Sequence, residues 1–352
     1  MYRHHIHDYQ PKEDLDMDTF LFAGSNTCRG FFGYYDQLLK RAQRSIILKG
    51  GPGVGKSTFI REAGKHLLQK GQTVQFFACS GDPDSLDALW AEECGLLIVD
   101  GTSPHMLDPL LPGAQDGIVN LGECLNEKQL ENQKTEIREL SQDTTARFQQ
   151  AYRYLQAAEC LMQDAFHVYR EATDPRHLQA LQKELSVQIC PRDEGEGFDT
   201  FVQSITCKGT LQNPDLLRAD QIICLDLPWG FCAHDILSDL QIRSQINHWQ
   251  HTVYHDPLNP DRIAHLQIGR TLFTTAVMMD APRYEIDLDK TVLAQHMNRM
   301  SFNRAAYDLM LHQAYDALNE AKTLHDKLER CYIDAMNFDR LSEMRTRTIA
   351  AL

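Results

Sequence analysis

The sequence lacks several features that would place it in a specialised class of protein. No run approaches the roughly 18 apolar residues that a membrane-spanning helix needs. The first residues, MYRHHIHDYQ, lack the apolar stretch of a signal peptide. The 10 cysteines form no CxxC pair, and a chain of 352 residues does not need disulfides to hold its core. We therefore expect a cytoplasmic protein with reduced cysteines.

Positive charge is also scarce. Lys and Arg number 35 against 49 Asp and Glu, which gives a formal net charge of -14 at pH 7. Such a charge repels nucleic-acid phosphates and anionic lipid unless basic groups cluster locally, and the sequence contains no basic cluster. We therefore expect neither nucleic acid nor a membrane as a partner.

What the chain does contain is an internal repeat. The segment DTFLFAGSNTCRG, which begins at Asp18, returns as DTFVQSITCKG, which begins at Asp199. A fainter match links SIILKGGPGVGKSTFIREA to QIICLDLPWGFCAHDILSD later in the chain. Repeats of this kind indicate duplicated structural units, so we expect two lobes in tandem.

Helical segments repeat as well. AYRYLQAAECL, from Ala151, aligns with AYDALNEAKTL, from Ala314, and the same ungapped alignment pairs Tyr169 with Tyr332. Both regions are rich in Ala, Leu, Gln and Glu with a period near 3.6 residues, which is typical of helices. Each lobe is therefore predicted to carry a helical hairpin.

These patterns divide the chain into an N-terminal tail, a first core, a helical hairpin, a linker, a second core and a C-terminal hairpin. The predicted boundaries are 1–17, 18–122, 123–190, 191–198, 199–290 and 291–352. Continuous apolar runs at residues 73–78 and 96–99 fit strands of a parallel sheet that is covered on both faces. The predicted fold class is α/β, with two doubly wound lobes in tandem.

One motif points to a ligand. The pattern G-x-x-x-x-G-K-[ST] lies between a predicted strand and a predicted helix. Glycines allow such a loop to wrap around phosphate oxygens with its N–H groups turned inward, and the following helix faces the anion with its positive end. The residues expected to bind nucleotide are Gly50, Gly51, Pro52, Gly53, Val54, Gly55, Lys56, Ser57 and Thr58.

A second motif supplies a carboxylate. The buried strand LLIVD ends at Asp100, at the edge of the sheet where ligands bind in such folds. We expect Lys56 to contact the β and γ phosphates, and Ser57 and Asp100 to hold Mg²⁺. Lys56 and Asp100 are therefore the leading catalytic candidates.

With these two motifs, residues 45–100 resemble the P-loop NTPase superfamily. The layout of the whole chain is similar to a poorly characterised bacterial family of tandem P-loop ATPase-like proteins with a degenerate second copy. The resemblance implies P-loop-type lobes and the cofactors ATP and Mg²⁺, and it implies no substrate.

The second copy departs from the pattern. The alignment places Cys232 opposite Lys56 and Ala233 opposite Ser57. A site without the lysine, the hydroxyl and most of the glycines cannot hold a triphosphate in this way. We predict one functional nucleotide site and one pseudo-site.

Asp82, Asp84 and Asp87 follow the second predicted strand. Kinases that share this core present a carboxylate there as a general base, and the alternative is a turn that caps a helix. Asp82-Pro83 finds a counterpart in the second copy, Asp256-Pro257, which favours the structural alternative.

His105 lies just beyond Asp100 and could place a water molecule, although a histidine in a loop is more often only hydrogen-bonded. Gly101 occupies a position where many vigorous ATPases carry a glutamate, so hydrolysis is expected to be slow. Arg29 and its counterpart Lys208 could contact a phosphate across the lobe interface or be solvated loop charges.

The leading interpretation is a slow Mg-dependent ATPase, or a nucleotide-dependent switch, that acts on an unknown partner, with a protein as a candidate. One alternative is a small-molecule or nucleotide kinase with Asp82 or Asp84 as its base. Another is a non-catalytic interaction protein that nucleotide stabilises.

Overall fold

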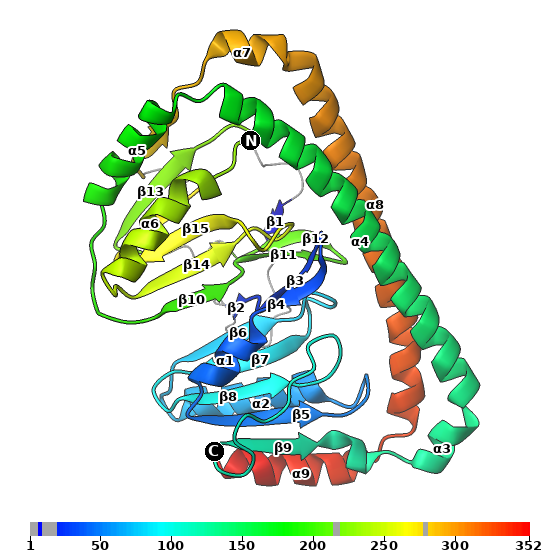
Figure 1. Cartoon of the computed structure of the whole chain (residues 1–352). Helices are drawn as coiled ribbons and strands as arrows, with labels where there is room; N and C mark the ends of the chain where they lie inside the picture. The colour runs from blue at the N-terminus through cyan, green and yellow to red at the C-terminus, as the bar shows by residue number, and fades with distance from the viewer. Residues whose placement is uncertain (1–5, 9–19, 214–218, 277–280) are drawn as a thin grey trace.

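The computed structural model describes residues 6–8, 20–213, 219–276 and 281–352. They form two α/β lobes joined along one side by two long helices (Figure 1). Most of the predicted N-terminal tail lies outside the described residues. Its strand β1 (Ile6–Asp8) pairs in parallel with β12 (Gly209–Gln212), so part of the tail adds a strand to the second half of the chain.

The first lobe is built on a six-stranded sheet with the spatial order β2-β6-β7-β8-β5-β9. Its strands are β2 (Phe20–Leu21), β5 (Arg44–Lys49), β6 (Val74–Ala78), β7 (Leu86–Ala91), β8 (Leu96–Asp100) and β9 (Asp116–Asn120). β7 runs antiparallel to both of its neighbours, whereas the other pairs are parallel. The sheet is therefore mixed: β6 and β8, which contain the two predicted runs, point the same way, and between them lies the unpredicted β7, which a short turn after β6 reverses without a crossover helix.

Two helices cover opposite faces of this sheet. α1 (Tyr35–Arg41) packs Leu38 and Leu39 against one face, and α2 (Lys56–Gln69) packs Phe59 and Ile60 against the other. The buried residues of α2 recur at helical spacing, which explains why this segment folds as an amphipathic helix.

The second lobe repeats the first, strand by strand. Its sheet has the order β10-β14-β15-β16-β13-β17, which matches the order of the first sheet position by position. Its strands are β10 (Gly197–Thr200), β13 (Gln221–Asp226), β14 (His251–His255), β15 (Ile263–Ile268), β16 (Thr271–Thr274) and β17 (Arg283–Glu285), and its helix is α6 (His234–Ile246). The predicted duplication is confirmed. The predicted linker overlaps the start of β10.

Each half also contains a β-hairpin, formed by β3 (Gly24–Thr27) with β4 (Gly30–Gly33), and by β11 (Gln203–Thr206) with β12. Just before these hairpins, Phe22 and Phe201 exchange two backbone hydrogen bonds of 3.0 Å. Counted back from the shared Thr-Cys-basic-Gly turn, Phe22 is the counterpart of Phe201, whereas the DTF opening alone would pair Phe201 with Phe20. Equivalent positions therefore meet across an approximate twofold axis between the halves.

The helical regions match with equal fidelity. They consist of α3 (Glu127–Asn132), α4 (Lys134–Glu171) and α5 (Pro175–Val187) in the first half, and of α7 (Lys290–Gln295), α8 (Met297–Asp334) and α9 (Phe338–Ala350) in the second. α4 and α8 have 38 residues each, and Asp174 and Asn337 cap the N-termini of α5 and α9 with their side chains. A short 3-10 helix, η1 (Leu121–Cys124), precedes α3.

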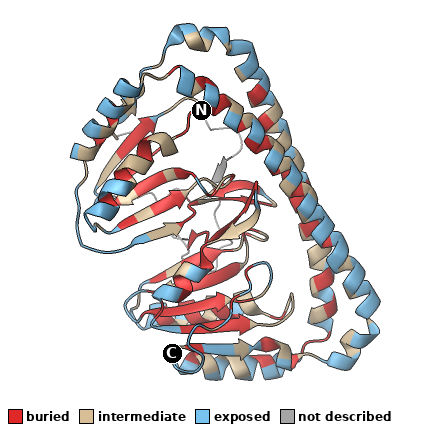
Figure 2. Ribbon diagram, in the orientation of Figure 1, coloured by how far each residue is buried: buried red, intermediate tan, exposed pale blue. Residues whose placement is uncertain are grey.

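The helices are exchanged between the lobes. α4 packs along α8, α5 packs against α6 of the second lobe, and α9 packs against α2 of the first lobe (Figure 1). The prediction that each half forms its own helical hairpin is therefore wrong. A helix of 38 residues is about 57 Å long, which is enough to carry the chain from one lobe to the other. Figure 2 shows the buried residues concentrated in the sheets and along the inner side of the paired helices.

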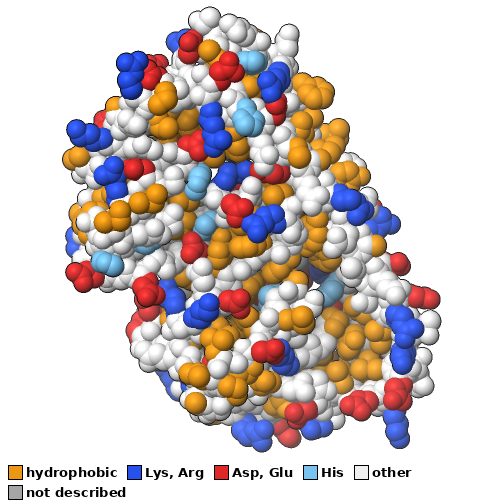
Figure 3. Space-filling model, in the orientation of Figure 1, with side chains coloured by type: hydrophobic (Ala, Val, Ile, Leu, Met, Phe, Trp, Pro, Cys, Tyr) orange, Lys and Arg blue, Asp and Glu red, His pale blue; other side chains and the backbone are white. Residues whose placement is uncertain are grey.

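The surface does not separate the charges by sign on the face shown in Figure 3, where Lys and Arg side chains are interspersed with Asp and Glu. Among the described residues, no helix combines the length and apolar character that crossing a membrane requires.

Candidate functional site

The loop that joins β5 to α2, residues 50–55, is here named the glycine loop. Gly50, Gly53 and Gly55 have positive φ angles of 147°, 69° and 86°, a backbone conformation that favours glycine. α2 begins at Lys56, and its N-cap residue Gly55 provides no side-chain hydrogen bond. The first amides of α2 therefore have no side-chain acceptor, and such amides at a helix start are suited to an anion.

Lys56 and Asp100 meet beside this loop. β5 and β8 are parallel neighbours, with Leu48 in register with Asp100. The Lys56 ammonium lies 3.6 Å from the Asp100 carboxylate and donates to the Gly51 carbonyl at 2.8 Å. The side chains of Lys56 and Asp100 are only 11% and 13% exposed. The two leading catalytic candidates thus share one small, largely buried polar site.

Asp100 and Ser57 are also held by neighbouring backbone. One oxygen of Asp100 accepts from the amide of Thr102 at 2.8 Å and from its hydroxyl at 2.6 Å. Ser57 Oγ accepts from the amide of Leu86, the first residue of β7, at 2.9 Å. Because the hydroxyl is the acceptor in this bond, it keeps a second lone pair that could bind a cation.

The outer side of the glycine loop is covered by helices from the second half. A Cβ built on Gly51 would lie 2.6 Å from the Tyr332 ring, and one on Gly53 would lie 2.9 Å from the backbone oxygen of Glu329, both in α8. A Cβ on Gly55 would lie 3.3 Å from Leu341 in α9. Close approach of these helices therefore requires small residues in the loop, independently of any phosphate.

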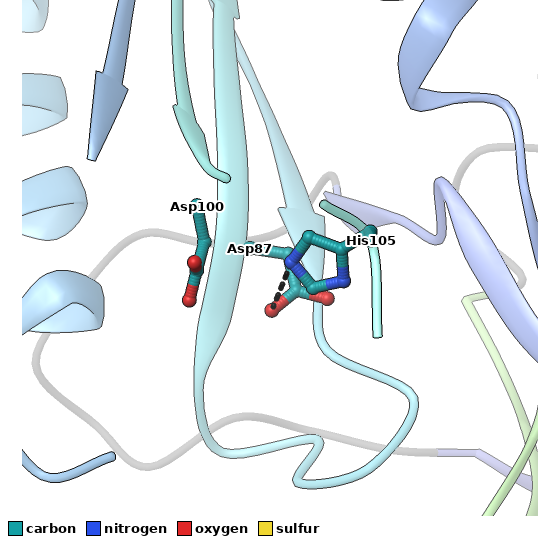
Figure 4. Close-up of side chains that lie close together, drawn as sticks. All are labelled: Asp87, Asp100 and His105. Atoms are coloured by element: carbon teal, nitrogen blue, oxygen red, sulfur yellow. Dashed lines mark ion pairs between the residues drawn. The ribbon is translucent and has the colours of Figure 1, made fainter. Parts of the chain in front are cut away.

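Two further ionisable side chains lie beside Asp100 and form a cluster of three with it (Figure 4). The three are Asp87 on β7, Asp100 on β8 and His105 in the loop after β8, and one ligand atom from each lies within 4.8 Å of the others. The nearest atoms of Asp87 and His105 are 4.0 Å apart. From the sequence, Asp87 could be placed only in the segment after a predicted strand. Its position beside Asp100 could not be predicted, because it depends on the antiparallel direction of β7.

Burial dominates the chemistry of Asp87. Desolvation raises the pKa of this carboxyl group, whereas the charge of His105 lowers it and the charge of Asp100 raises it further. Hydrogen bonds from Tyr35 and Cys79 lower the pKa but do not offset the effect of burial. The Tyr35 hydroxyl donates to Asp87 at 2.8 Å. The ionised form of Asp87 is therefore destabilised by burial, and a cation in the cluster would reduce this destabilisation.

Asp82 and Asp84 lie in the turn between β6 and β7, where the amide of Ser85 donates to the Asp82 carbonyl at 2.8 Å. The expectation that this turn caps a helix is wrong, because β7 follows it. Asp82 lies 3.3 Å from Lys322 of α8, and Asp84 lies 2.8 Å from Lys208. Both candidate bases thus form ion pairs with the second half of the chain.

Arg29 forms the equivalent contact in the opposite direction, 2.5 Å from Asp261 in the second lobe. Arg29 and Lys208 are therefore cross-lobe ion-pair partners of the two matching turns. The basic residue of each Thr-Cys-basic-Gly turn thus forms an ion pair with the other half of the chain and is not an unpaired loop charge.

The second lobe corrects the alignment of the two loops. His234 Nδ1 accepts from the amide of Ile263 at 3.4 Å, just as Ser57 accepts from Leu86 at the start of the matching strand. His234 is therefore the counterpart of Ser57, and the predicted pairing of Ser57 with Ala233 is wrong by one residue.

The same shift places Ala233, not Cys232, opposite Lys56. The turn before the next strand shifts as well. Asp84 and Asp261 both stand two residues before their strands, so Asp82-Pro83-Asp84 matches Asn259-Pro260-Asp261 rather than the predicted Asp256-Pro257.

Comparisons of the chain with protein-family models, with curated proteins and with solved structures give no match.

Proposed function

We propose that the first lobe binds one nucleoside triphosphate, ATP, together with Mg²⁺, at the glycine loop and the start of α2, as a P-loop-type lobe does. One observation carries the proposal. A loop whose glycines have positive φ angles leads into α2, and the first residue of α2, Lys56, lies 3.6 Å from the Asp100 carboxylate at the end of β8. Loop amides and Lys56 would hold the β and γ phosphates, and Ser57 and Asp100 would hold Mg²⁺ directly or through water.

Slow turnover follows from the packing around Gly101. A Cβ at this position would lie 2.3 Å from Ile47, so no side chain fits directly after Asp100 to polarise an attacking water. The proposed activity is accordingly a slow Mg-dependent ATPase.

The exchanged helices support a switch. α8 and α9 contact the glycine loop, and two ion pairs, Lys322 with Asp82 at 3.3 Å and Arg345 with Glu62 at 2.7 Å, attach them to the first lobe. A change of loop conformation with nucleotide state would therefore act on α8 and, through its pairing with α4, on the other lobe. The partner that such a change would address is unknown, and a protein is the candidate.

The kinase alternative has less support, because each proposed base, Asp82 and Asp84, forms an ion pair with a lysine of the second half. A role as an interaction protein that nucleotide only stabilises would require binding without turnover.

Calorimetry with Mg-ATP on the full chain tests the proposal. Lys56→Ala and Ser57→Ala should each weaken binding by about tenfold or more, because they remove a phosphate and a metal contact. Lys65→Ala, an exposed lysine on the same helix, and His234→Ala, the counterpart of Ser57, are the matched controls. Unchanged affinity in both test variants would reject the glycine loop as the nucleotide site.

A further inference from the structure

The strongest unexplained polar feature is the imidazole of His105. The residue is 8% exposed, and neither of its ring nitrogens has a hydrogen-bond partner among the described residues. Its ring stacks on Tyr35 with centroids 4.4 Å apart and an interplanar angle of 14°, which fixes its orientation. A buried imidazole without a hydrogen-bond partner carries a desolvation cost, which a ligand on one of its nitrogens would reduce.

The carboxylates beside His105 favour a cation as that ligand. The neighbours of His105 in the cluster are two carboxylates, Asp87, which is 4% exposed, and Asp100. His105 Nε2 lies 4.0 Å from Asp87 Oδ1, and the Lys56 ammonium lies 3.6 Å from Asp100 and donates to a loop carbonyl. The buried Asp87 and the largely buried Asp100, beside an imidazole whose nitrogens accept or donate no hydrogen bond among the described residues, form an electron-rich site that one ammonium group at its edge only partly balances.

We propose that Asp87, Asp100 and His105 bind a divalent transition-metal ion, of the Mn²⁺ or Zn²⁺ class. Ligand atoms on one metal ion at bond lengths of about 2.1 Å lie roughly 3 to 4.2 Å apart, and those of the cluster lie within 4.8 Å of one another. Two carboxylate oxygens and one imidazole nitrogen are donors that this class of metal accepts.

The second lobe supplies an internal comparison. In the first lobe, Ala88 pairs with Val99 across two antiparallel strands. Asp87, just before Ala88, and Asp100, just after Val99, are therefore the next positions toward the same edge of the sheet. In the second lobe, His265 pairs with Thr274 at the same place in the sheet, so the counterparts of the two carboxylates are Ala264 and Thr275. Among the described residues, the second lobe therefore has neither of the two carboxylates, and it also lacks the lysine and the serine.

The site would share Asp100 with the proposed Mg²⁺-nucleotide site but does not depend on it. Asp87 and His105 have no part in the nucleotide proposal, and the metal would bind to the chain without nucleotide. Asp100 would then connect the two cations, as bridging carboxylates do in paired metal sites.

Titration of the full chain with Mn²⁺ alone, without nucleotide, tests the inference. Loss of the free-ion signal in electron paramagnetic resonance measures binding, and Mn²⁺ is chosen because His4, His5 and His7 near the N-terminus would bind softer metals. We expect one bound Mn²⁺ per chain.

Asp87→Asn and His105→Ala should weaken Mn²⁺ binding by about tenfold or more. Asp108→Asn, a carboxylate in the same loop whose side chain is 95% exposed, should leave it unchanged. Lys56→Ala should lose nucleotide and keep Mn²⁺, so the two proposals fail separately. The metal site would be overturned if the unmodified chain did not bind Mn²⁺, or if Asp87→Asn and His105→Ala both bound Mn²⁺ as tightly as the unmodified chain.

Discussion

The glycines of the loop are required by helix packing, whatever the loop binds. Gly53 meets the backbone of α8, and its counterpart in the second lobe, Gly230, would place a Cβ 2.7 Å from Ala165 of α4. Both have positive φ angles, 69° and 84°. The second lobe thus keeps this glycine because a helix of the other half lies against it, although the lysine and serine are missing.

Asp100→Asn removes the charge of this side chain and keeps its shape. We expect Asp100→Asn to bind nucleotide but to lose most Mg²⁺-dependent turnover, by about tenfold to a hundredfold, because the amide keeps an acceptor for Thr102 but does not order the metal shell. Rates of ADP release with and without Mg²⁺ measure the effect. Full turnover in the variant would remove Asp100 from the site.

His265 makes stability depend on pH. Burial lowers the pKa of His265 from 6.5 to about 4, so the folded state binds its proton less readily than the unfolded state. Its stabilising contribution is complete above pH 6.5 and is lost as pH falls from 6.5 to about 4. In urea unfolding, the stability lost between pH 7 and pH 5 should be smaller in His265→Gln than in the natural chain. The exposed His177→Gln is the control, and equal losses in all three proteins would contradict this assignment.

At the level of elements, Tyr332 of α8 and Tyr169 of α4 form a matched pair. Tyr332 contacts Gly51 of the glycine loop, and Tyr169 lies beside Gly230 of the second lobe. Tyr332→Ala should weaken Mg-ATP binding by several fold, on the order of 1 kcal/mol, because the loop loses a packing contact that holds its conformation. Tyr169→Ala should not change binding. Equal affinities in the two variants would separate α8 from the nucleotide site.

The elements themselves were largely predictable from sequence. Ala151 and Ala314 fall at buried positions of two helices of equal length, as the ungapped alignment requires. The lobe that each helix covers was not predictable, because an amphipathic stripe specifies an apolar partner but not which of two similar lobes provides it.

The candidate site divides in the same way. The glycine loop and Lys56 follow from a local pattern, since a strand, a loop and a helix start are contiguous in sequence, and Asp100 follows from its place at the end of an apolar strand. The contact between Asp87 and His105 could not be predicted, because it depends on the direction of β7 and on the course of the loop after β8.

At the level of the whole molecule, the helix exchange implies that the halves depend on each other. Residues 191–196 between α5 and β10 are exposed, and cleavage there would leave α5 on the second lobe and α9 on the first. With a protease site inserted in this segment, the two fragments should elute together at the size of the intact chain under native conditions. Separation into two folded fragments would show that the lobes are independent.

We propose that one lobe binds nucleotide and that its duplicate does not. The second lobe has Ala233 and His234 where the first has Lys56 and Ser57, and Thr275 where the first has Asp100. Equilibrium dialysis of the full chain against Mg-ATP at saturation measures the number of sites directly. We expect one nucleotide per chain, and none in Lys56→Ala. Two nucleotides per chain, or one that survives Lys56→Ala, would contradict it.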